Sequence, residues 1–216
     1  MEAPMRANNI EAFGTQLLAS RLVAILRGVP DDALLPLCEM LVEEGWRLIE
    51  VPLSDPGALG QIEMLRKALP ADVHVGAGTV MNAELSAAAR DSGAGFLVTP
   101  HTSPTVIRFA AEHDLGMICG AMTPTDIAFA REVGARFIKL FPASALGPGY
   151  VRQLLGPYSD LEMLAVGGIG SSNLREYLDA GVIGAGVGGA LVVRGGGDEA
   201  LARARIEARA LDRLVC

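Results

Sequence analysis

The feature that most constrains the fold is an alternation, repeated eight times, of a short apolar run and an amphipathic stretch. The runs rarely alternate with polar residues, so each predicts a strand buried on both faces, as in a parallel sheet covered by helices. They span residues 22–26, 47–51, 73–77, 96–98, 117–119, 137–141, 161–166 and 182–187. Eight such units within 216 residues predict a closed (β/α)8 barrel with short loops, rather than an open doubly wound sheet.

Helix-start signals follow several of these runs. Asn82 precedes an alanine-rich stretch, Ser103 begins a stretch that ends near residue 113, and Thr123 is followed by Pro124; each is a favoured N-cap or first-turn pattern. Residues 8–20 predict an additional helix that covers the bottom of the barrel. Because no linker or charge block interrupts the pattern, we expect one domain over residues 1–216, with residues 1–20 as an N-terminal extension and helix.

Composition narrows the class of partner. The net charge is −7, which argues against nucleic acid or an anionic membrane surface and leaves small molecules, anionic ones included. The histidines and cysteines show no spacing typical of a metal site or a disulfide framework. The first ten residues do not resemble a signal peptide, and no apolar run is long enough to span a membrane. The sequence therefore predicts a cytoplasmic protein.

One lysine lies inside a run that otherwise predicts complete burial. Lys139 is flanked by Phe137, Ile138, Leu140 and Phe141, and an ammonium among such side chains loses hydration that it does not readily recover. Burial of this kind favours the neutral amine, which attacks carbonyl groups and forms Schiff bases. The alternative is that Lys139 reaches solvent at the strand end or pairs with a carboxylate.

Further polar residues stand at predicted strand ends, where barrels of this type carry their active sites. They are Arg27, Glu50, Thr79 and Thr99. Glu50 is a second charge within an apolar run, and its sign is opposite to that of Lys139. The two charges form either an internal ion pair or a nucleophile with a carboxylate that moves protons. We favour the second interpretation because both residues stand at strand ends.

Glycine pairs follow the seventh and eighth runs. Backbone N–H groups that no side chain shields bind phosphate well, and these two loops are where such barrels usually hold it. The pairs are Gly167 with Gly168 and Gly188 with Gly189. Arg27 follows the first strand, which lies beside the eighth in a closed barrel, so we expect it to bind the same anion. The alternative is that the glycines only permit tight turns.

From residue 22 to residue 191 the chain resembles the class I 2-keto-3-deoxy-6-phosphogluconate and 6-phosphogalactonate aldolases. Six motifs, specific only in combination, carry the resemblance: Ala24-Ile25-Leu26-Arg27-Gly28, Ile49-Glu50-Val51, Gly76-Ala77-Gly78-Thr79-Val80, Val98-Thr99-Pro100, Ile138-Lys139-Leu140-Phe141-Pro142 and Ala165-Val166-Gly167-Gly168-Ile169. It implies a (β/α)8 barrel, usually a homotrimer, that splits a phosphorylated sugar acid into pyruvate and glyceraldehyde 3-phosphate without a metal or other cofactor.

The resemblance also implies roles for individual residues. Lys139 matches the Schiff-base lysine and Glu50 the general acid/base. Thr79 and Gly78 match contacts to the carboxylate end of the substrate, and Pro100 lines the site. The phosphate pocket of the family matches Arg27, Gly167, Gly168, Gly188 and Gly189.

Two positions favour the galactonate branch of this family. Gluconate-type enzymes typically have threonine before the double glycine and arginine shortly after the catalytic glutamate, whereas this chain has Val166 and Ser54. Valine exchanges no hydrogen bond with a sugar hydroxyl, so a C4 hydroxyl on that side loses a partner. The sequence thus favours 2-dehydro-3-deoxy-6-phosphogalactonate over its C4 epimer, the 6-phosphogluconate compound, as the main substrate.

One position departs from the family pattern. Relatives usually have serine where this chain has Gly189, so a hydroxyl donor worth about 1 kcal/mol is lost from the phosphate pocket. Two other readings also remain open from sequence. One is an isomerase or epimerase that uses Glu50 and Lys139 without a covalent intermediate, and the other is a catalytically silent barrel that binds a sugar acid.

Overall fold

The computed structural model describes residues 9–192 and 197–216. Its eight strands are all parallel, and each pairs with the next along the chain, with β8 closing on β1. The predicted (β/α)8 barrel is confirmed. The strands are β1 (Leu22–Ile25), β2 (Leu48–Pro52), β3 (His74–Gly78), β4 (Phe96–Val98), β5 (Gly116–Ala121), β6 (Phe137–Leu140), β7 (Glu162–Val166) and β8 (Gly184–Val187).

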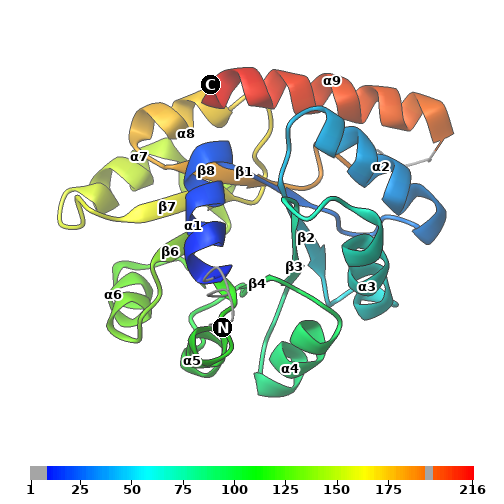
Figure 1. Cartoon of the computed structure of the whole chain (residues 1–216). Coiled ribbons are helices and arrows are strands. Elements are labelled where there is room, and N and C mark those ends of the chain that lie inside the picture. Colours follow the sequence, from blue (N-terminus) through cyan, green and yellow to red (C-terminus); the bar gives the residue numbers. More distant parts are fainter. Residues whose placement is uncertain (1–8, 193–196) are drawn as a thin grey trace, which may run out of the picture.

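Over the described residues, eight helices surround the barrel, and α1 lies across one end of it, the bottom (Figure 1). The helices are α1 (Asn9–Ser20), α2 (Asp31–Glu43), α3 (Ala58–Ala68), α4 (Ala83–Asp91), α5 (Pro104–Glu112), α6 (Pro124–Glu132), α7 (Ala143–Leu155), α8 (Leu174–Ala180) and α9 (Gly197–Val215). None of these helices is both long enough and apolar enough to cross a membrane.

The helix-start signals act as predicted. The Asn82 side chain accepts from the Leu85 N–H, Ser103 accepts from Val106, and Thr123 forms a reciprocal capping box with Asp126. The helix after β6 gave no such signal. There α7 begins after Pro142 and is kinked at Gly147, whose φ of 75° is outside the helical region, and this break hides its helical periodicity.

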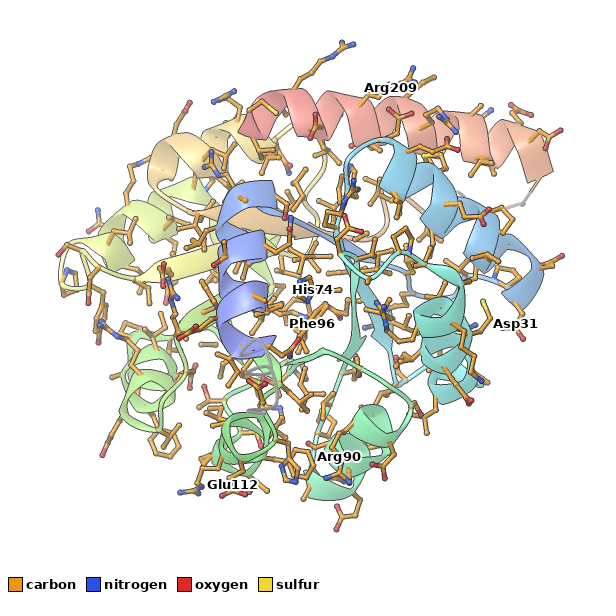
Figure 2. All side chains as sticks on the ribbon, viewed as in Figure 1. Asp31, His74, Arg90, Phe96, Glu112 and Arg209 are labelled. Atoms are coloured by element: carbon orange, nitrogen blue, oxygen red, sulfur yellow. The ribbon has the colours of Figure 1, made fainter. Side chains whose placement is uncertain are left out.

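The helix α1 closes the bottom of the barrel. Its Phe13 and Leu17 are buried in an apolar cluster inside the strands, and the Phe13 ring stacks on Phe96 with centroids 5.0 Å apart. Figure 2 labels His74 and Phe96 beside this helix at the centre of the barrel. The structure thus confirms the predicted cover as residues 9–20; residues 1–8 lie outside the described ranges.

Strand residues divide between two cores according to which way they point. The larger core lies between the strands and the outer helices, while alternate residues face inward and form the barrel interior. In β2 the inward residues are Leu48 and Glu50, and in β6 they are Phe137 and Lys139. The apolar member of each pair belongs to the interior cluster, so the two charged side chains lie one layer nearer the C-terminal mouth.

Candidate active site

Glu50 and Lys139 are placed by strands on opposite sides of the barrel. Glu50 pairs in register with Ile25 of β1 and Gly76 of β3. Lys139 pairs with Gly120 of β5 and Leu164 of β7. Glycine therefore stands next to each charged residue, and its missing side chain leaves space at the mouth of an otherwise filled barrel.

The Glu50 carboxyl group is buried without a partner. The residue is 2% exposed, and its Oε1 atom makes no hydrogen bond in the described structure. A methyl group added at Gly78 would lie 1.9 Å from this oxygen, so only glycine fits there. Burial raises the pKa of Glu50, against the opposing positive charges of Lys139 and Arg27. Such a carboxyl group is suited to exchange protons with a bound molecule.

Lys139 is also buried and unpaired. It is 7% exposed, and its Nζ lies 5.2 Å from the centre of the Phe141 ring. In the described part of the chain it makes no hydrogen bond and no salt bridge, not even with Glu50. The interpretation of these two residues as a stable internal ion pair therefore has no support, and the amine is left available to a ligand.

Arg27 reaches toward β2 and β3 rather than toward β8. Its Nη1 donates to Ser54 Oγ at 2.7 Å and its Nη2 to Thr79 Oγ1 at 3.2 Å. Thr79 has a φ of 57°, which is strained for a β-branched residue and is the kind of strain that collects at functional sites. The guanidinium thus lies with Thr79 on the Glu50 side of the mouth.

Pro100 lies over the strand next to Lys139. A methyl group on Gly120 would be 2.3 Å from the Pro100 carbonyl carbon, so the loop after β4 crosses directly above this glycine. The buried Thr99 hydroxyl fixes the crossing by accepting the Gly120 N–H at 3.0 Å. Because Gly120 is the register partner of Lys139, Pro100 lines the same mouth.

The two glycine pairs lie side by side at the ends of β7 and β8. Val166 pairs with Gly186 in register, and Gly168 and Gly188 follow each of these by two residues. Gly168 and Gly189 are both exposed, and within the described residues their backbone N–H groups donate no hydrogen bond. This edge therefore offers neutral N–H donors to an anion.

Sequence reasoning singled out Ser54 only as a position that distinguishes the two branches of the family, and it missed Asp55 and Ser144 at this mouth. Ser54 and Asp55 follow β2 and bind the loop that carries Arg27. Ser144 of α7 lies against Gly168, where an added methyl group would be 2.4 Å from its Oγ. All three are polar residues in turns or at a helix start, and nothing local distinguishes them from ordinary surface residues.

The assembled site has three chemical components: a buried amine, a buried carboxyl group, and an edge of free backbone donors. An amine nucleophile and a proton-transfer group that face the same barrel mouth are the two groups that imine chemistry on a carbonyl compound requires. The separate N–H donors suit an anionic group at the far end of the same ligand.

Comparisons with known proteins agree with this chemistry. The family described as KDPG and KHG aldolase matches residues 14–205. A protein of Escherichia coli (strain K12) named 2-dehydro-3-deoxy-6-phosphogalactonate aldolase is 36% identical over 168 residues, which are 77% of this chain and 82% of the relative.

Solved structures share the fold at similar coverage. One described as native KDPGal superposes with a TM-score of 0.84 at 34% identity, over 89% of this chain and 93% of the other. A KDPG aldolase from Legionella pneumophila, with pyruvate captured as a covalent carbinolamine intermediate, gives a TM-score of 0.79 at 25% identity and covers 94% and 95%. With this extent of likeness, the chain belongs to the KDPG and KHG aldolase family.

Proposed function

We propose that this chain is a Schiff-base aldolase that cleaves 2-dehydro-3-deoxy-6-phosphogalactonate into pyruvate and D-glyceraldehyde 3-phosphate. The observation that carries the proposal is the pair of buried charged residues, Glu50 and Lys139. Within the described structure, neither Glu50 Oε1 nor Lys139 Nζ has a hydrogen-bond partner. Leaving two such groups unsatisfied costs folding stability, which is typical of groups that meet a substrate. The covalent carbinolamine in the Legionella relative supports the same chemistry.

In the proposed mechanism, Lys139 Nζ attacks the C2 carbonyl carbon of the sugar acid. Loss of water gives an imine, which accepts the electron pair of the C3–C4 bond when the proton of the C4 hydroxyl is removed. The aldehyde fragment leaves, C3 of the resulting enamine is protonated, and hydrolysis releases pyruvate and the free amine. Glu50 is the proposed proton carrier in these steps, because it is a buried carboxyl group at the mouth without a hydrogen-bond partner at Oε1 in the described structure.

We propose that the phosphate binds at the loops after β7 and β8. The free N–H groups of Gly168 and Gly189 support this role, with Gly167 and Gly188 as their neighbours in the same loops. At the other end, Thr79, Gly78 and Pro100 are proposed to border the carboxylate and the reacting carbons. The phosphate role that the resemblance implied for Arg27 lacks such support, because its guanidinium is bound to Ser54 and Thr79.

The preference for the galactonate epimer is proposed on Val166. This side chain faces inward at the end of β7 and is 6% exposed, so it presents an apolar surface to the substrate between the amine and the phosphate loops. The names of the relatives support the same epimer. The C4 epimer, the 6-phosphogluconate compound, is the alternative main substrate.

The test is mass spectrometry after borohydride reduction in the presence of pyruvate. Hydride reduces the imine to a stable amine, so one pyruvate-derived adduct is expected on Lys139, and Lys139→Ala is expected to abolish it together with aldol cleavage. Cleavage rates of the two C4 epimers then identify the substrate, with the higher kcat/KM expected for the galactonate compound. A folded protein that forms no adduct would support the isomerase alternative.

Three further expectations belong to this proposal. We propose that residues 1–216 act as one domain, that the protein works in the cytoplasm, and that it assembles as a homotrimer. The charge of −7 supports a small-molecule partner rather than nucleic acid or a membrane surface. Sedimentation or light scattering measures the state of assembly directly.

A further inference from the structure

The turn after β2 contacts the loop after β1 through two adjacent side chains. Ser54 Oγ accepts from Arg27 Nη1 at 2.7 Å and donates to Asp55 Oδ1 at 3.4 Å. The other oxygen of Asp55 accepts the Gly28 N–H at 2.6 Å. Asp55 therefore fixes the backbone next to Arg27, while Ser54 fixes the end of its side chain.

These contacts hold an exposed arginine that would otherwise sample many conformations. Ordering an arginine side chain costs up to about 2 kcal/mol of conformational entropy, so a single exposed hydrogen bond is a weak restraint. Here the restraint is distributed over the side chain and the backbone, because Gly28 follows Arg27 and its φ of 69° sets the direction of the loop. The guanidinium is thereby directed to the β2–β3 side of the mouth.

The restrained position has a definite electrostatic use. Two of the five guanidinium N–H donors are occupied by Ser54 and Thr79, so others remain for a ligand. The buried Glu50 lies on the same side of the mouth, on β2. An anionic group bound at Arg27 therefore meets a positive charge, whereas the β7–β8 edge provides neutral backbone donors.

We infer that Ser54 and Asp55 are positioning residues that hold Arg27 for the carboxylate of the substrate, at the end of the site opposite the phosphate. The inference rests on the proposed aldolase function, which supplies a ligand with an anion at each end. A planar carboxylate suits a guanidinium, which binds it through two parallel hydrogen bonds. The phosphate is left to the backbone N–H groups after β7 and β8.

The experiment measures the two ends of the substrate separately. Borohydride trapping at increasing pyruvate concentration gives the half-saturation for the carboxylate fragment, and initial rates of the reverse condensation give KM for glyceraldehyde 3-phosphate. Ser54→Ala and Asp55→Asn are expected to raise the pyruvate half-saturation about tenfold, the effect of losing one hydrogen bond to a charged group. KM for the phosphorylated aldehyde is expected to stay unchanged.

Two further variants separate positioning from a general loss of structure. Ser54→Thr keeps the hydroxyl and is expected to restore the pyruvate half-saturation of the unsubstituted protein. Asp91→Asn makes the same chemical change as Asp55→Asn at an exposed aspartate whose ion pair, among the described residues, is with Arg90 at the end of α4. It is expected to change neither constant.

Each outcome decides the question. An unchanged pyruvate half-saturation in both Ser54→Ala and Asp55→Asn would overturn the inference. A rise in KM for the phosphorylated aldehyde without a change for pyruvate would instead assign Arg27 to the phosphate. If the unsubstituted protein traps no pyruvate, the proposed function itself fails, and the inference falls with it.

Discussion

At the scale of single residues, the site is built from groups that destabilise the fold. Glu50 Oε1 is buried without a hydrogen bond, and Lys139 is 7% exposed without an ion-pair partner in the described chain. Burial raises the pKa of Glu50 and so disfavours its charged form. In the proposed function, the bound substrate satisfies these two groups.

The burial of the Glu50 carboxyl group gives a prediction for Glu50→Gln. Because burial raises the pKa of Glu50, its contribution to stability is fully present below the pKa of the unfolded chain, about 4.3. That contribution is lost as pH rises through the higher pKa of the folded state. The glutamine variant carries no charge, so it is expected to unfold at a higher temperature than the unsubstituted protein at pH 8 and to lose this advantage below about pH 4.

The same substitution is expected to slow turnover. Removing a proton-transfer group typically costs about 10²–10⁴-fold in kcat, while trapping of pyruvate on Lys139 still occurs. Thermal unfolding across the pH range and steady-state kinetics at pH 8 check the two effects together. A variant that is less stable at pH 8 and fully active would contradict the role given to Glu50.

At the scale of elements, α1 closes the bottom of the barrel, at the end opposite the candidate active site. Phe13 is 1% exposed and packs against Phe96 and Phe137 at the bottom. A methyl group on Gly116 would lie 2.4 Å from its ring, so the strand closest to α1 has glycine at the contact. Glu50 and Lys139 lie one layer above this apolar floor.

Phe13→Ala is therefore expected to reduce stability without altering catalysis. Truncating a buried phenylalanine costs about 3–5 kcal/mol, which urea unfolding measures, and kcat per folded molecule should be unchanged. Phe129→Ala serves as the control, because Phe129 is 44% exposed on α6 and its loss should cost far less. A large fall in kcat for the folded Phe13→Ala protein would show that α1 also shapes the site.

At the scale of the whole molecule, the barrel must join its last unit to its first. Strand β8 pairs with β1, and outside them α9 lies along α2 (Figure 1). Three ion pairs join these helices, because Glu44 accepts from Arg205 and Arg209 and Glu43 accepts from Arg205. The two arginines also offset the unfavourable placement of acidic residues at the C-terminal end of α2.

Glu44→Gln is expected to weaken this junction in a pH-dependent way. Hydrogen bonding from Arg209 lowers the pKa of Glu44, so its contribution is present above the unfolded pKa, about 4.3, and is lost as pH falls through the lower folded value. The variant should unfold about 2–4 °C below the unsubstituted protein at pH 7, and the difference should shrink below about pH 4.

Glu63→Gln is the matched control for this prediction. Glu63 forms one exposed i,i+4 pair with Lys67 within α3, and a single exposed pair contributes little to stability. Scanning calorimetry of both variants at pH 7 and pH 4 compares them directly. Equal shifts for the two would show that the α2–α9 network is no stronger than an isolated surface pair.

The sequence by itself determined the barrel and identified the two buried charged residues that we propose to be reactive. Eight apolar runs with helical stretches between them specify parallel strands covered by helices. The spacing of apolar residues along the sequence shows both which segments are buried and whether they are strands or helices. Lys139 and Glu50 could be identified from the same pattern, because a charged residue inside an otherwise apolar strand is an exception to it.

Only the tertiary structure decided how the mouth of the barrel is arranged. Ser54, Asp55 and Ser144 are ordinary turn or helix-start residues in sequence, and their contacts join loops that follow different strands. The sequence led us to expect Arg27 at the β7–β8 anion site, although its backbone stands between β8 and β2 and a flexible side chain can reach either side. The hydrogen bonds that fix that direction form only after the barrel has closed and brought these loops together.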